Sequence, residues 1–163
     1  MEFQIQAKLL AELKYEMDML YVATEMALST NHKEYPLDSM IFEVVLFHFR
    51  VVWDFFYVRG KKTDFTVRDV LAIDQLKAHR PKEPKRLREI HEQYVDGMLA
   101  HLSQKRIDSD LKQQVPGRDD FLLIRKHTEN LFNGFVAALT PEQRSAFKNP
   151  LAHKFTNFQV LQP

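Results

Sequence analysis

The sequence predicts an all-α fold: a helical bundle of four long helices plus one or two short ones, in a single domain over residues 1–163. Apolar residues recur at three- and four-residue steps over long stretches, and proline, glycine and small polar residues gather between those stretches. No segment alternates apolar and polar residues between hairpin turns, as strands do. With 45% hydrophobic residues, a chain of 163 residues can bury one substantial core.

The first predicted helix spans residues 2–28, with no glycine or proline inside it. Asp38 can cap a second helix, which we expect to run to about Arg59 and to stop at Gly60. The core-facing positions of the first helix are Leu10, Leu13, Met17, Leu20, Thr24 and Ala27.

The second half of the chain predicts the remaining helices. Thr66 and Asp69 form an approximate capping box for a short helix. Pro84 suits the first turn of a third long helix over residues 84–107, and a fourth covers residues 121–138. A capping box at residues 140–143 predicts a short fifth helix. The core positions of the fourth long helix are Phe121, Ile124, Thr128, Leu131, Phe135 and Ala138.

Polar side chains interrupt the most aromatic stretch of the chain, VLFHFRVVWDFFY, in the second predicted helix. At roughly 100° per residue, Arg50 and Asp54 fall on one polar stripe, spaced so that they can pair. His48 projects from a different side and therefore faces a different neighbour. Two interpretations of this stripe are open. It can be a partly buried site, in which Arg50 would need a partner, or it can be the solvated edge of a central helix.

A second polar group stands in the third long helix. His101 projects onto the core-facing stripe, close in direction to His91, whereas Arg106 projects roughly 140° away from His101. Each histidine could instead be a packed core residue that donates to a backbone carbonyl. Whether the two helices bring Arg50, Asp54 and His101 into one site stays open at this stage.

A basic segment precedes the third long helix. A cation-rich start is unfavourable for a helix dipole, and phosphate contact would explain it. A solvated helix start is the plainer interpretation. The segment KAHRPKEPKRLR holds six cations and one glutamate; the cations are Lys77, Arg80, Lys82, Lys85, Arg86 and Arg88.

Several function classes have no support in the sequence. No Glu-x-x-His pair, His-Glu-x-x-His motif, phosphate-binding glycine loop or Gly-x-Ser-x-Gly motif occurs, and the chain has no cysteine. We therefore expect no metal and no cofactor. The chain has no run of eighteen apolar residues and no basic-apolar leader, so we expect a cytoplasmic protein without a membrane partner.

Two segments carry a resemblance. LFHFRVVWDFFY and DGMLAHLSQKR resemble a group of small bacterial helical proteins with His-x-Arg-x-x-x-Asp-Phe-Phe and Ala-His-Leu-Ser/Thr segments. The histidine segment is also distantly similar to the HEPN superfamily, whose members include metal-independent ribonucleases that act as dimers through an Arg-Asn-x-x-x-His motif. Asp96 and Gly97 stand where that motif has arginine and asparagine; Arg86 and His91 match its spacing alone.

The resemblance implies an RNase or RNA-binding protein of a bacterial defence or toxin type that forms a homodimer. His101 would exchange the proton, Arg50 or Arg106 would hold the phosphate, and His48 and Asp54 would complete the catalytic group. The basic segment would bind the RNA backbone. The alternative is a non-catalytic helical-bundle module that binds another ligand or serves a structural role. A small-molecule or nucleotide pocket between the helices is a third possibility.

Overall fold

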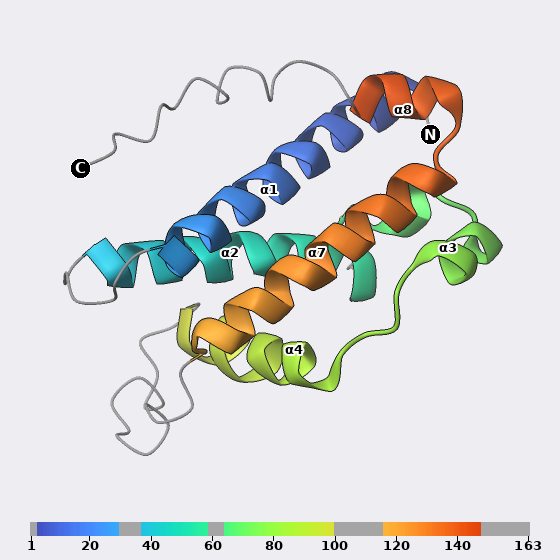
Figure 1. Cartoon of the computed structure of the whole chain (residues 1–163). Helices are drawn as coiled ribbons and strands as arrows, with labels where there is room; N and C mark the ends of the chain where they lie inside the picture. Colours follow the sequence, from blue (N-terminus) through green and yellow to red (C-terminus); the bar gives the residue numbers. More distant parts are fainter. Residues whose placement is uncertain (1–2, 30–36, 59–63, 100–115, 148–163) are drawn as a thin grey trace.

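The computed structural model describes residues 3–29, 37–58, 64–99 and 116–147, all of it helices and short connections (Figure 1). Its elements are α1 (Phe3–Ser29), α2 (Leu37–Tyr57), η1 (Val67–Asp69), α3 (Ile73–His79), α4 (Lys85–Ile90), η2 (His91–Leu99), α7 (Arg118–Ala138) and α8 (Pro141–Phe147). The described part of the chain contains no strand, which confirms the all-α fold.

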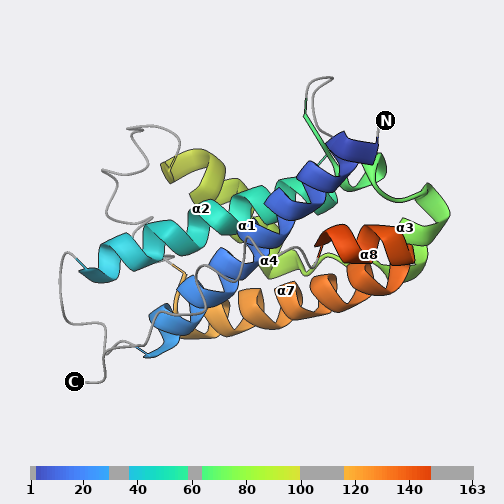
Figure 2. The ribbon, with the colours of Figure 1, turned by 90° about the horizontal axis from the view of Figure 1, so that it is seen from above.

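Three long helices form the body of the molecule. α1 runs in one direction and α2 and α7 return in the other, as Figures 1 and 2 show. Arg118, at the start of α7, donates through Nη1 to the carbonyl oxygen of Leu28 near the end of α1, at 2.6 Å, as that antiparallel arrangement requires. The predicted core positions of the first and fourth long helices are all buried, so the helical period placed them correctly.

The third long helix of the sequence prediction differs from the structure. It begins as the α-helix α4 and continues as η2, a π-helix that starts at His91. Residues 100–107 lie outside the described residues. The short helix predicted after Thr66 is divided into the 3₁₀ turn η1 and the α-helix α3. Three of the four predicted long helices are thus present as continuous α-helices. The third is described as α4 followed by the π-helix η2.

Both predicted capping boxes are present. The backbone N–H of Thr66 donates to Oδ2 of Asp69 at 2.7 Å. The backbone N–H of Thr140 donates to Oε1 of Gln143 at 2.9 Å, and the N–H of Gln143 donates to Thr140 Oγ1 at 3.3 Å. These bonds satisfy backbone donors that have no partner inside the first helical turn.

No helix in the described ranges combines the length and the apolar character needed to cross a membrane.

Candidate functional site

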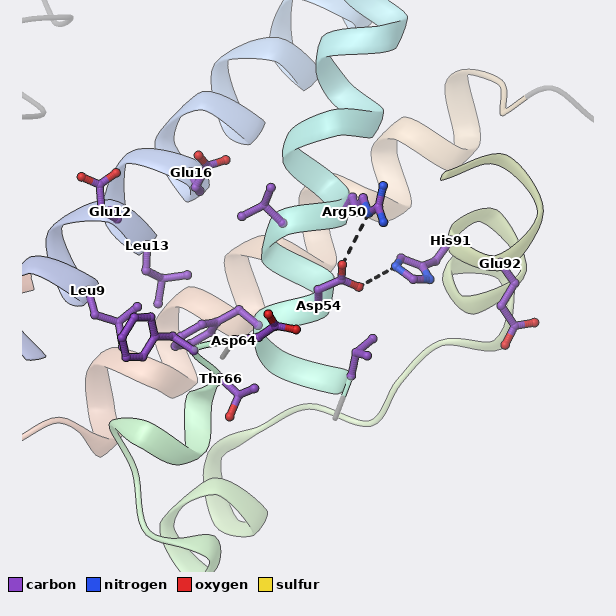
Figure 3. Close-up of a pocket in the computed structure, with 14 residues that line it drawn as sticks. Leu9, Glu12, Leu13, Glu16, Arg50, Asp54, Asp64, Thr66, His91 and Glu92 are labelled. Atoms are coloured by element: carbon purple, nitrogen blue, oxygen red, sulfur yellow. Dashed lines mark hydrogen bonds and ion pairs between the residues drawn. The ribbon is translucent and has the colours of Figure 1, made fainter. Parts of the chain in front are cut away.

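A cleft of about 800 Å³ opens between the first half of α1 and the second half of α2. The segment before η1 and the first residues of η2 complete its rim (Figure 3). Its lining combines apolar walls with charged side chains: Leu9, Glu12, Leu13, Glu16, Arg50, Val51, Asp54, Phe55, Val58, Asp64, Phe65, Thr66, His91 and Glu92.

Negative charge dominates this cleft. Five carboxylates line it, whereas Arg50 is its one permanently charged cation. The carboxylates come from four separate regions of the chain: Glu12 and Glu16 on α1, Asp54 on α2, Asp64 before η1 and Glu92 in η2. Carboxylates held together beside apolar walls create a negative potential that attracts cations and repels phosphates.

Asp54 is the centre of the polar group in the cleft. Its Oδ1 lies 2.8 Å from Nε2 of His91, and its Oδ2 lies 3.6 Å from Nε of Arg50. An ionised carboxylate can only accept a hydrogen bond, so His91 donates through Nε2–H. The side chain of His91 is 8% exposed and that of Asp54 is 40% exposed. The imidazole is therefore buried, and the carboxylate that it contacts reaches the solvent. Figure 3 shows the contact between the two side chains.

Local structure explains why these three groups meet. Arg50 and Asp54 are four residues apart on α2 and so share a side of the helix. His91 stands where α4 changes to π winding, a feature often found at functional sites. The indole of Trp53 stacks on His91, with ring centroids 5.8 Å apart at 26°, which fixes the plane of the imidazole.

His48 lies behind the cleft and reaches it through Glu16. It is buried, and its Nδ1–H donates to Oε2 of Glu16 at 2.7 Å. The rings of Tyr15 and Phe47 meet His48 edge-on, with centroids 6.3 and 5.3 Å away. His48 and Arg50 thus face different neighbours, as the helical projection predicts. In this position His48 orients a cleft carboxylate and is not itself part of the lining.

The predicted catalytic residues are only partly brought together. Arg50 and Asp54 share the cleft, and the histidine beside them is His91, whereas the sequence prediction gave this role to His101. His101 and Arg106 lie outside the described residues. Arg86 and His91, which match the motif by spacing alone, have different partners: Arg86 binds Asp120, whereas His91 binds Asp54.

Three arginines of the basic segment are engaged within the molecule. Arg86 forms a bidentate ion pair with Asp120, in which both N to O distances are 2.8 Å. This pair holds the pKa of the Asp120 carboxyl below its ordinary value and links α4 to α7. Arg88 binds Glu83 in the same manner, at 2.7 and 2.9 Å.

Arg80 caps the end of α2. Its Nη1 donates to the carbonyl oxygen of Phe56 at 2.6 Å, and its guanidinium lies 4.9 Å from the ring centroid of Tyr57. Of the three lysines, Lys77 and Lys82 are exposed, and Lys85 is 3.6 Å from Glu89 with its side chain 92% exposed. All three lysines of the segment therefore face the solvent.

A pair formed by the partly buried Tyr57 and the buried His127 is missing from the sequence prediction. The Tyr57 oxygen lies 2.8 Å from His127 Nε2 and 2.9 Å from the carbonyl oxygen of Pro81. Tyrosine has one proton, which it donates to the carbonyl, so Nε2–H of His127 donates to the Tyr57 oxygen. Burial lowers the pKa of His127 to about 4 and raises the pKa of Tyr57. Residues 70 positions apart carry no local sequence signal for such a pair.

Metal binding has no candidate ligand set within the described ranges: no three His, Asp or Glu side chains there are placed to hold an ion. The chemistry available at the cleft is the attraction of a cation to its carboxylates, together with proton exchange at the His91 and Asp54 pair.

Comparisons with protein-family models, with curated proteins and with solved structures found no match to the chain.

Proposed function

We propose that the protein is a binding module whose cleft accepts an organic cation with an apolar body. The observation that carries this proposal is the lining, in which five carboxylates stand beside the apolar side chains of α1 and α2. The whole chain has a net charge of +1, so the attraction belongs to the site and not to the molecule.

The two components of the lining suit two parts of one ligand. An ammonium or guanidinium group would pair with Asp54 and Glu12, while an alkyl or aryl body would displace water from Leu13, Val51 and Phe55. Asp54 is already oriented by His91 and Arg50, so it would lose little conformational freedom on binding. Phe55 and Phe65 add ring faces and edges to a lining in which a cation could also contact an aromatic ring.

The test compares hexylamine, which is protonated at neutral pH, with hexanol, which has the same apolar body and no charge. Binding is read by calorimetry and by fluorescence of the single tryptophan, Trp53, which stacks on His91. We expect hexylamine to bind and hexanol to bind far more weakly. Asp54→Asn should weaken the binding of hexylamine on the order of tenfold, because a cation loses one of its paired carboxylates.

The matched control is Asp119→Asn, which removes an exposed carboxylate from the first turn of α7, away from the cleft. It should leave the affinity for hexylamine unchanged. Equal binding of hexylamine and hexanol, or equal losses in the two variants, would contradict the proposal.

RNA binding or cleavage by a homodimer is the second candidate function. One observation favours it: a carboxylate orients the imidazole of His91 beside the guanidinium of Arg50, an arrangement suited to proton transfer next to a bound phosphate. His101 would supply the remaining acid or base, and Lys77 and Lys82 would contact the backbone of the RNA. The acidic lining of the cleft opposes phosphate entry and places this candidate second.

Its test is cleavage of labelled tRNA in EDTA by the wild type and by the variants His101→Ala and His91→Ala. If the candidate is right, cleavage resists EDTA and both variants lose it while their melting temperatures show that they are folded. Cleavage retained by His101→Ala would remove His101 from the mechanism, and no cleavage by the wild-type dimer would leave the cation-binding module.

A further inference from the structure

α2 carries an apolar stripe on the surface, in addition to the residues that it buries. Met40, Val44 and Phe47 are 60%, 39% and 57% exposed. They follow one another at steps of four and three residues, so they lie on one side of the helix. The same progression continues to Val51, which lines the cleft. Exposed apolar residues in helical register mark a surface that packs against another helix.

We propose that this stripe is the interface with a second copy of the chain, with the two α2 helices packed antiparallel. The steps along the stripe are four, three and four residues, a pattern that reads the same in both directions. In an antiparallel pair, Met40 therefore lies opposite the partner's Val51, and Val44 lies opposite the partner's Phe47. Every apolar residue of the stripe meets an apolar residue of the other copy.

The charges beside the stripe are complementary in the same arrangement. Glu43 and Arg50 lie on one flank of the stripe, about 20° apart around α2 and two turns apart along it. In an antiparallel pair each flank meets the same flank of the other helix. Glu43 then lies opposite the partner's Arg50, and Arg50 lies opposite the partner's Glu43. This reciprocal match favours a second copy over an unrelated helix as the occupant.

The proposed pairing also completes the cleft. α2 begins at Leu37, so in this register the partner's first turn of α2 lies opposite Asp54 of the cleft. The start of a helix carries positive partial charge, which suits a site lined by five carboxylates. Each of the two clefts would then receive one end of the partner's α2. The dimer rests on no step of the cation-binding proposal, but the partner's α2 and an organic cation would compete for Val51 and the cleft carboxylates, so dimerisation should weaken the binding of hexylamine.

The first experiment measures molar mass by light scattering and sedimentation over a wide range of protein concentration. The wild type should reach twice the 19.3 kDa mass of one chain. Phe47→Glu should raise the dissociation constant at least on the order of a hundredfold, because it places two carboxylates in the apolar centre of the interface. Leu122→Glu is the control, since Leu122 is also exposed, at 44%, but lies on α7. Circular dichroism checks that both variants fold, and Val44→Glu provides a second test of the same stripe.

Charge exchange tests the antiparallel register. Glu43→Arg and Arg50→Glu should each weaken self-association on the order of tenfold, because each variant places like charges opposite one another. Mixed together, the two variant chains should form a heterodimer in which both pairs join opposite charges, one pair with its native signs and the other with its signs reversed. Three results would each overturn the proposal. The wild type could stay monomeric, the Phe47→Glu variant could dimerise as the wild type does, or the mixture could form no heterodimer. Hexylamine binding to the Phe47→Glu monomer shows whether the cation site stands independently.

Discussion

At the scale of single residues, the neutral state of His127 makes the clearest prediction about pH. The buried ring of His127 donates to Tyr57, whose own ring lies beneath the Arg80 guanidinium. The pKa of His127 is lowered from 6.5 to about 4. Between these two values the unfolded chain binds more protons at this residue than the folded chain does. Stability therefore falls as the pH drops from about 6.5 to about 4, by roughly 2 to 3 kcal/mol from His127.

The measurement is urea unfolding at a series of pH values for the wild type and for His127→Gln. The variant should be less stable near neutral pH but should show a flatter dependence in this window, because glutamine does not titrate. His79→Gln is the control, since His79 is exposed on α3 and the change should leave the pH dependence of stability as in the wild type. A His127→Gln curve parallel to that of the wild type would show that another group is responsible.

The same scale shows what the sequence could foresee about the site. Arg50 and Asp54 are neighbours on one helix, so their spacing predicted that they can pair, and they are 3.6 Å apart. The partner of Asp54 could not be predicted in that way. His91 reaches Asp54 because α2 and η2 pack side by side, and the angle at which helices cross depends on all the side chains between them. The sequence marked His91 as a residue near the direction of His101 and as a match, with Arg86, to the spacing of a motif, but not as a partner of Asp54.

At the scale of elements, Gly134 allows the close approach of α7 and α3. A β-carbon built on Gly134 would lie 2.1 Å from the carbonyl oxygen of His79, the last residue of α3. Alanine is the better helix former by about 1 kcal/mol, but here the added methyl group meets backbone and not a flexible side chain. We expect Gly134→Ala to lower the free energy of unfolding by about 1 to 3 kcal/mol in chemical denaturation.

Asn133→Ala is the matched control for Gly134→Ala. Asn133 is an exposed neighbour on α7, so there the gain in helix propensity should appear without a clash. A Gly134→Ala variant stabilised as much as Asn133→Ala would mean that α3 moves away at negligible cost.

The winding of the helices was harder to predict than their positions. Periodicity and capping residues located α1, α2, α7 and α8 because each local signal agrees with the burial of one apolar face. The π winding of η2 and the 3₁₀ turn of η1 follow from tertiary packing, which overrides small local preferences. The sequence between Pro84 and Leu99 therefore predicted a helix but not the change of winding at His91.

At the scale of the whole molecule, the net charge predicts no attraction of a cation, whereas the local charge of the cleft predicts attraction. The chain carries 23 Lys and Arg against 22 Asp and Glu, so a cation would feel no attraction from the total charge. The cleft concentrates five of the carboxylates in one place, and attraction over a few ångströms is governed by that concentration. The affinity for hexylamine should therefore fall severalfold as salt rises, because the screening length shrinks from about 10 Å at 0.1 M to about 3 Å at 1 M.

Calorimetric titrations at increasing sodium chloride concentration measure this dependence. Asp54→Asn, which removes one of the negative charges of the cleft, should show a weaker salt dependence than the wild type. Asp119→Asn should show the same salt dependence as the wild type. If the affinity does not change with salt, burial of the alkyl chain accounts for binding, and the carboxylates serve to hold His48, His91 and Arg50 in place. If both variants lose the dependence equally, the attraction is spread over the molecular surface and the cleft has no special part in it.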